Sequence, residues 1–223
     1  MFSDASVKEI DIFRRKCQRV DKRALLFLDE THVLSNAVPL YSLAPAGEKV
    51  HLTVDRESFA IRVDVLDSCA VDALGPYRIV SASERRQMHV KGIRKDMFLE
   101  FFEDEIVPFA RLRMEPKTVF IVDKSSIHDQ QEMFTVADEL LPDTIVKVWR
   151  LPTNSAKFLG PLDNGLHSEL QCSFAELVQY TDRSESAVVD CVQEFFVHFD
   201  PFKLRSFYHH CGLFGPGFIV SRM

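Results

Sequence analysis

Three aspartates lie in apolar surroundings, where a charged carboxylate is energetically unfavourable. Residues kept at such positions are candidates for a chemical role. Asp29 interrupts the apolar run 24–34, and Asp123 ends the apolar run 118–122. Asp163 lies in the first turn of a segment with apolar residues at helical intervals. Carboxylates so placed lose hydration and repel one another, and a cation that prefers oxygen ligands, Mg²⁺ or Mn²⁺, offsets both costs. Two such ions about 3.5–4 Å apart support phosphodiester cleavage, so the three aspartates indicate a metal-dependent nuclease.

The elements that must position these aspartates can be predicted from hydrophobic periodicity. Strands are expected at 24–34, 49–55, 59–67, 76–82, 118–122 and 144–151, with the second and third forming an antiparallel hairpin. Helices are expected at 94–114, bent or restarted at Pro108, and at 129–141, 161–177, 185–199 and 201–210. This order predicts an α/β fold with a central mixed sheet flanked by helices and a helix-rich C-terminal part.

Length and composition permit one α/β domain. The chain has 223 residues, and 46% of them are apolar, so it can bury a sizeable core. We expect a basic N-terminal extension at 1–23, a catalytic-type domain at 24–215 and a C-terminal tail at 216–223. No apolar run is long enough to span a membrane, and the charged N-terminus is unlike a secretory signal, so we expect an intracellular protein. The five cysteines lack metal-ligand spacing and are expected to be reduced thiols.

Positive charge is local in this sequence. The formal net charge of −6 argues against a protein that binds nucleic acid with its whole surface. Two basic runs, 14–23 and 84–95, are either solvated surface or phosphate-binding patches. The second run supplies five candidate DNA contacts, Arg85, Arg86, Lys91, Arg94 and Lys95. The first could support nuclear import, so we expect the nucleus, with an organelle as the alternative.

Three stretches resemble the successive catalytic motifs of mariner-like transposases, members of the DDE/D group with an RNase H-like fold. They are FLDETHV at 27–33, FIVDKSSIH at 120–128 and LPTNSAKFLGPLDNGLHSELQ at 151–171. The 39 residues between Asp123 and Asp163 and the 93 between Asp29 and Asp123 also resemble that family, in the branch whose triad ends in aspartate. The resemblance implies an RNase H-like fold and transposase-derived DNA cleavage or strand transfer with Mg²⁺ or Mn²⁺ at a two-metal site.

The resemblance also implies roles for particular residues. It makes Asp29, Asp123 and Asp163 the catalytic carboxylates that bind the metal ions. Glu30, which follows the first aspartate, would support the site. His128 would orient the site or touch the phosphate, and the alternative is a polar core residue satisfied by hydrogen bonds.

The second and third motifs depart from the usual family pattern. Val122 and Lys124 replace the glutamine and the asparagine around the second aspartate. Ala156 and Lys157 replace a Pro-Asp pair in the third motif. Lys124 would either bind phosphate or compete with the metal, and Lys157 is a further candidate DNA contact.

Two functional hypotheses follow. Transposases of this kind carry helix-turn-helix modules ahead of the first aspartate, and only 28 residues precede Asp29. We therefore expect DNA to be bound through the local basic patches, with partner proteins or a homodimer as further partners. The first hypothesis is an active nuclease or strand transferase. The second is a domesticated, inactive RNase H-like scaffold in a larger assembly, which the acidic net charge and Lys124 favour.

Overall fold

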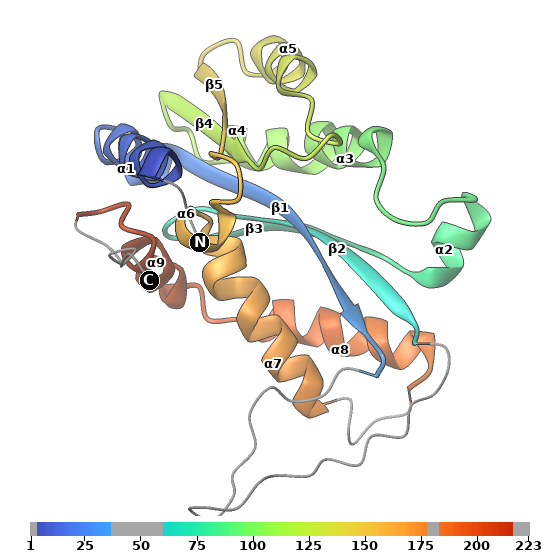
Figure 1. The fold of residues 1–223 in the computed structure, drawn as a ribbon. Helices are drawn as coiled ribbons and strands as arrows, with labels where there is room; N and C mark the ends of the chain where they lie inside the picture. The colour runs from blue at the N-terminus through green and yellow to red at the C-terminus, as the bar shows by residue number, and fades with distance from the viewer. Residues whose placement is uncertain (1–3, 37–59, 178–182, 216–223) are drawn as a thin grey trace, which may run out of the picture.

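Five strands form one mixed sheet in the order β3-β2-β1-β4-β5 (Figure 1). The computed structural model describes residues 4–36, 60–177 and 183–215. The strands are β1 Leu25–Leu34, β2 Arg62–Cys69, β3 Leu74–Val80, β4 Lys117–Val122 and β5 Ile145–Arg150. β3, β2 and β1 run antiparallel, whereas β1, β4 and β5 run parallel. The sheet and the helices around it confirm the predicted fold class.

Helices cover both faces of this sheet (Figure 1). They are α1 Asp4–Gln18, α2 Ala82–Gln87, α3 Lys95–Phe101, α4 Val107–Leu112, α5 Gln130–Leu140, α6 Ala156–Leu159, α7 His167–Leu177, α8 Glu185–His198 and α9 Phe202–His210. There are also a 3₁₀ turn, η1 Lys22–Ala24, and two π-helical turns, η2 Phe102–Ile106 and η3 Leu162–Leu166. Among the described helices, none combines the length and the apolar character needed to cross a bilayer.

Alternation along the central strand β1 assigns its side chains to two separate cores. Leu25 and Phe27 pack with residues of α1 and α6 to α9 on what we call the α7 face. Leu26 and Leu28 pack with residues of α3, α4 and α5 on what we call the α3 face. Because successive side chains of a strand point to opposite faces, Asp29 belongs to the α7 face and Glu30 to the α3 face.

The predicted strands can be compared with the observed ones. Those predicted at 24–34, 76–82, 118–122 and 144–151 correspond to β1, β3, β4 and β5, in that order. The strand predicted at 49–55 lies outside the described residues. Its predicted hairpin partner, 59–67, overlaps β2, whose two neighbours in the sheet are β1 and β3.

The helix predicted at 94–114 is continuous but changes its winding before Pro108. The backbone N–H of Val107 bonds to the carbonyl of Phe102, five residues back, within the π-helical turn η2. Pro108 has no N–H to donate and stands in the first turn of α4. The disruption expected at the proline therefore lies one turn earlier, and Phe102 and Ile106 of that turn are both buried against the sheet.

The helix predicted at 161–177 consists of η3 followed by α7. Its predicted apolar stripe is confirmed for Leu166, Leu170 and Phe174, which are buried in the core of the α7 face. The side chain of Leu177 lies outside the described ones.

Most of the segment assigned to a basic extension forms the helix α1. Ile10, Phe13 and Cys17 of this helix are buried in the core of the α7 face. Arg14 is also buried, and its Nε donates to the carbonyl of Cys211 at 3.0 Å. α1 thus packs on the same core as the sheet, and the tail assigned to 216–223 lies outside the described residues.

Candidate active site

The central strand places Asp29 beside two other aspartates. In the antiparallel register of β1 and β2, Asp29 lies directly opposite Asp67. The parallel register of β1 and β4 pairs Phe27 with Ile121, and continuing it by two residues aligns Asp29 with Asp123. Like charges directly opposite each other destabilise a sheet, so this arrangement calls for cations that offset the repulsion.

Asp163 reaches the α7 face from the π-helical turn η3. The backbone N–H of His167 bonds to the carbonyl of Leu162, five residues back. Gly165 lets this turn approach α9 closely, since a Cβ at that position would lie 2.2 Å from the Phe207 ring. The local backbone therefore brings Asp163 and His167, four residues apart, to the sheet together.

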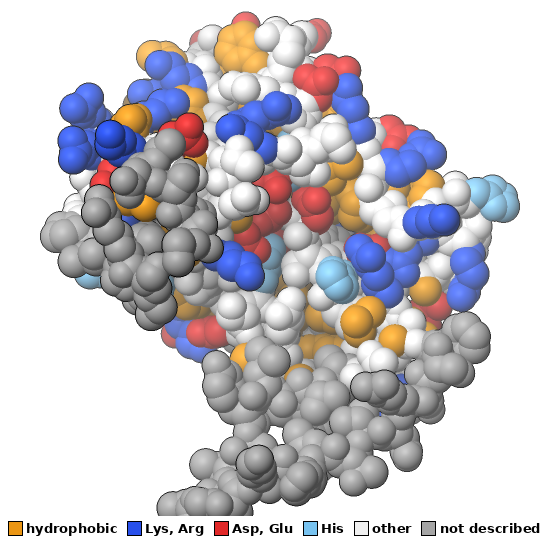
Figure 2. Space-filling model, viewed as in Figure 1, with side chains coloured by type: hydrophobic (Ala, Val, Ile, Leu, Met, Phe, Trp, Pro, Cys, Tyr) orange, Lys and Arg blue, Asp and Glu red, His pale blue; other side chains and the backbone are white. Residues whose placement is uncertain are grey.

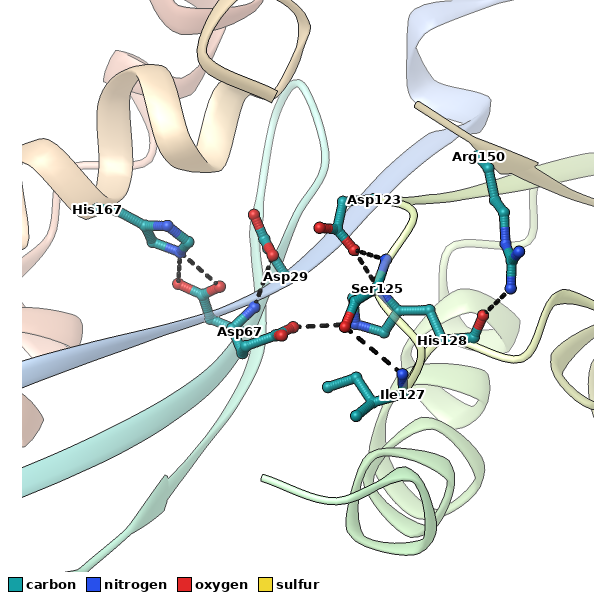
Figure 3. Close-up of polar contacts among 9 residues, drawn as sticks. Asp29, Asp67, Asp123, Ser125, Ile127, His128, Arg150 and His167 are labelled. Atoms are coloured by element: carbon teal, nitrogen blue, oxygen red, sulfur yellow. Dashed lines mark hydrogen bonds and ion pairs between the residues drawn. The ribbon is translucent and has the colours of Figure 1, made fainter. Parts of the chain in front are cut away.

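His167 is a buried histidine between carboxylates. Its Nε2 lies 3.0 Å from Asp67 Oδ1 and 3.1 Å from Asp67 Oδ2 (Figure 3). Its Nδ1 lies 3.5 Å from Asp163 Oδ1. Burial alone would lower the pKa of His167, but Asp67, Asp163 and Asp29 together raise it well above the usual value. Without a metal ion, a protonated His167 thus offsets part of the negative charge around it.

Asp29 is the carboxylate that its surroundings disfavour most. Burial raises its pKa well above the usual range; His167 opposes this rise, whereas Asp163 and Glu30 add to it. Asp29 Oδ1 accepts a hydrogen bond from the Glu30 backbone N–H at 2.9 Å. One potential ligand atom each from Asp29, Asp163 and His167 lies within 4.8 Å of the other two. Two carboxylates in need of positive charge at this spacing fit a hard divalent cation.

Asp123 begins a turn after β4. Its Oδ1 accepts hydrogen bonds from the Ser125 backbone N–H and from His128 Nδ1, each at 2.7 Å (Figure 3). Burial would raise the pKa of Asp123, but these two hydrogen bonds outweigh it, so the pKa is lowered. Asp123 is therefore a carboxylate held ionised in one orientation, and it lies outside the cluster of Asp29, Asp163 and His167.

His128 joins the first two motifs on the α3 face. Its ring is fully buried and packs on Phe98, with 4.3 Å between the ring centroids. Its Nε2 lies 3.0 Å from Glu30 Oε2, while Nδ1 contacts Asp123. Burial alone would lower the pKa of His128, but the two carboxylates raise it to about 9. This placement supports orientation of Asp123 rather than contact with a phosphate.

A cleft of about 600 Å³ opens between Asp123 and Asp163. Its lining includes the loop and helix start at 151–157 together with Lys124 and Ser125. Lys124 and Lys157 are exposed there, and Lys124 Nζ donates to Thr153 Oγ1 at 3.1 Å. Both lysines proposed from the sequence thus line the same cleft as the two carboxylates.

The five cations of the run 84–95 are placed differently. Arg85 is buried, where its guanidinium pairs with Asp64 and donates to the Arg62 carbonyl, so it is not a DNA contact. Arg86 and Arg94 are exposed and pair with Glu185 and Asp96, respectively. Lys95 is half-buried and pairs with Asp129 and Glu132, and Lys91 is exposed. Figure 2 shows acidic side chains gathered at the centre of one face, with Lys and Arg side chains around them. The lysines of the cleft are therefore the better placed candidates.

Asp67 and His167 were not among the residues selected from the sequence. Both had a local signal: Asp67 lies in the apolar run 59–67, and His167 follows Asp163 at helical spacing. Each signal is weak alone, because one charged residue in a strand and one histidine on a helix are common. Only the contact between Asp67 and His167, which are 100 residues apart in sequence, shows that both belong to the site.

Solved structures of the Mos1 transposase share this fold. The Mos1 transposase paired-end complex with left transposon end has a TM-score of 0.67 at 15% sequence identity, and the match covers 95% of this chain and 60% of that one. The Mos1 mariner paired end complex with Mn gives 0.62 at 14% identity, covering 95% and 60%. The catalytic domain of Mos1 mariner transposase gives 0.54 at 12% identity, covering 95% and 90%.

These matches define what the likeness establishes. This chain spans about three fifths of the transposase in the complexes and nearly all of the catalytic domain. No protein-family model and no curated protein sequence matches it. At 12–16% identity the likeness is one of fold, and it confirms the RNase H-like fold that the three motifs predicted.

Proposed function

We propose that this chain is the catalytic core of a transposase-derived, divalent-metal-dependent enzyme that hydrolyses or transesterifies DNA phosphodiesters. The observation that carries the proposal is the convergence of three carboxylates in a chain with the fold of the Mos1 catalytic domain. Asp29 comes from β1, Asp123 from the turn after β4 and Asp163 from η3. Asp29 and Asp163 approach each other, and Asp163 shares a cleft with Asp123.

The three carboxylates would bind two cations between them. Asp29 and Asp163 would bind one divalent ion on the α7 face, and Asp123 would bind another from across the cleft. Such ions, when bound, activate the attacking oxygen and stabilise the leaving oxygen of a phosphodiester. The choice of Mg²⁺ or Mn²⁺ is supported by Mos1 paired-end complexes with Mn and with Mg. His128 keeps Asp123 ionised and directed toward the cleft.

DNA is the proposed substrate and partner. Lys124 and Lys157 on the cleft wall would contact phosphates beside the scissile bond, because ammonium groups bind phosphate oxygens. Similar folds occur in a complex with a transposon end and in the Mos1 strand transfer complex. An enzyme acting on genomic DNA would work in the nucleus, and this location is part of the proposal.

Nicking of supercoiled plasmid tests this function. The folded protein should nick plasmid with Mg²⁺ or Mn²⁺ but not with EDTA, and Asp123→Asn should lose this activity. Asp138→Asn is the matched control, because Asp138 is exposed on α5, away from the described cleft.

Two outcomes would contradict the proposal. One is the absence of any cleavage of supercoiled or nicked plasmid by well-folded wild-type protein with either ion. The other is metal-dependent nicking that survives in Asp123→Asn at the wild-type rate, which would point to a contaminating nuclease.

A further inference from the structure

His167 presents its two ring nitrogens to two different surroundings. Nε2 faces the buried carboxylate of Asp67 at 3.0 and 3.1 Å. Nδ1 faces the cluster of Asp29 and Asp163, with Asp163 Oδ1 at 3.5 Å. A carboxylate thus holds one side of the imidazole, and the other side is turned to the residues that would bind a metal ion.

This arrangement selects a tautomer. When His167 is neutral, the proton on Nε2 is the one that Asp67 can accept, which leaves the lone pair on Nδ1. Histidines that bind metals usually donate their other ring N–H to a carboxylate or a carbonyl in this manner. The orientation of His167 is therefore that of a ligand, with Asp67 as its support.

Asp67 has no other evident reason to be an aspartate. Its side chain is fully buried, and it stands opposite Asp29, where a like charge is unfavourable. The ladder between β2 and β3 shifts register between Asp67 and Cys69, an irregularity at this point of the strand. A positioning role toward His167 accounts for a carboxylate that is costly in every other respect.

We propose that His167 Nδ1 is a nitrogen ligand of the metal ion held by Asp29 and Asp163, and that Asp67 is the positioning residue that aims it. This inference rests on the proposed metal-dependent function. Imidazole suits Mn²⁺ and other transition ions better than Mg²⁺, which prefers oxygen ligands and retains its waters. The site on the α7 face should therefore prefer Mn²⁺ over Mg²⁺.

Pulsed electron paramagnetic resonance of the full chain with Mn²⁺ alone tests the ligand directly. The spin-echo envelope should show modulation from a coordinated ¹⁴N nucleus, and labelling the histidines with ¹⁵N should change it. This comparison uses the wild-type protein and so does not depend on the folding of a variant. His167→Gln should lose the modulation, whereas His198→Gln should keep it; His198 is the control, because it is exposed in the last turn of α8 and is not part of the cluster of Asp29, Asp163 and His167.

Titration calorimetry with Mn²⁺ and with Mg²⁺ gives the second measurement. Asp67→Asn should weaken Mn²⁺ binding by about 10- to 100-fold, the usual effect of losing a residue that supports a metal ligand. His167→Gln should reduce the preference for Mn²⁺ over Mg²⁺, and circular dichroism shows whether each variant is folded.

The outcomes separate this inference from the proposed function. Bound Mn²⁺ with oxygen ligands only would overturn the role of His167 and would leave the carboxylate site intact. An absence of Mn²⁺ binding by folded wild-type protein would overturn both.

Discussion

Two histidine–carboxylate contacts flank the proposed catalytic aspartates, and they differ in which group each leaves available to bind a metal ion. On the α3 face, His128 Nδ1 bonds directly to Asp123 at 2.7 Å. On the α7 face, His167 bonds to Asp67 (Figure 3). Its other ring nitrogen lies 3.5 Å from Asp163. The first contact fixes a carboxylate, and the second fixes an imidazole. The same pair of residue types can therefore prepare either an oxygen ligand or a nitrogen ligand.

The second partner of each histidine explains this difference. His128 has carboxylates at both nitrogens, Asp123 and Glu30, which hold it protonated, with a pKa of about 9. His167 has its close partner at Nε2, and its Nδ1 faces Asp163 at the longer distance of 3.5 Å, within a cluster of potential ligand atoms. Both histidines are cations without a metal ion, but only His167 turns one ring nitrogen toward a group of potential metal ligands.

The largest expected effect comes from Asp163→Asn, which removes a proposed metal ligand on the α7 face. We expect nicking to fall by at least about 10³-fold, the scale on which enzymes lose transition-state charge stabilisation. The metal-free protein should not be destabilised, because one of several facing carboxylates is neutralised. Single-turnover nicking and urea unfolding in EDTA measure the two effects, with Asp138→Asn as the control. A well-folded variant that loses less than about tenfold, or 1.4 kcal/mol, would remove Asp163 from the site.

His128→Gln, on the α3 face, should lower the free energy of unfolding by an amount that depends on pH. The pKa of His128 is about 9 in the folded protein against 6.5 for an ordinary histidine. The protonated form is thus favoured by folding, and its stabilisation, roughly 3 kcal/mol, is fully present below about pH 6.5 and is lost as pH rises through 9. Urea unfolding of wild type and variant in EDTA should show a gap that closes at alkaline pH. A gap independent of pH would mean that His128 stabilises by packing alone.

Gly165→Ala should disturb the α7 side through the backbone. The added Cβ would lie 2.2 Å from the Phe207 ring, so either that ring or η3 must move. We expect a loss of about 1–3 kcal/mol in the free energy of unfolding, together with weaker metal binding, because Asp163 lies in the same turn. Adding Phe207→Ala should restore part of both.

Gly92→Ala is the control for this substitution, since the nearest atom to its Cβ is the end of the Arg62 side chain at 3.8 Å. Equal losses in the two glycine variants would show that the close approach of Gly165 to α9 is unimportant.

The smallest effects are expected at the cleft lysines. Lys124→Ala, beside Asp123, and Lys157→Ala, in α6, should each lower the salt dependence of DNA binding by about one phosphate contact. Stability should not change, because both side chains are exposed. Fluorescence anisotropy of a labelled duplex across a salt series measures this, with Arg86→Ala as the control for a cation paired outside the cleft. A larger effect of Arg86→Ala would move the DNA path toward α2.

The fold could be predicted, and the three aspartates could be selected, because their signals are local. Strand alternation and the change to helical spacing located β1, β4, β5 and α7. Asp29 was located as an interruption of an apolar run, and Asp123 at the end of another. The π-helical turns η2 and η3 could not be predicted in this way. They depend on how a proline or a glycine packs against other elements, as the contact between Gly165 and Phe207 shows.

The local sequence pattern could not predict which residues the charged side chains contact. Arg85 lies in a basic run and has the composition of a DNA contact, yet it is buried against Asp64. Asp67 and His167 form their contact across 100 residues. The partners of a charged side chain depend on sheet register and on which helix covers which face.

The sequence by itself determined where carboxylates interrupt apolar strands and which residues of β1 share a face, because the two-residue period of a strand is a local property. Only the tertiary structure decided that one histidine holds Asp123 and that another turns its imidazole toward Asp29 and Asp163. The reason is physical: the charge state and the free ligand atoms of a buried group depend on neighbours that the fold brings within hydrogen-bonding distance.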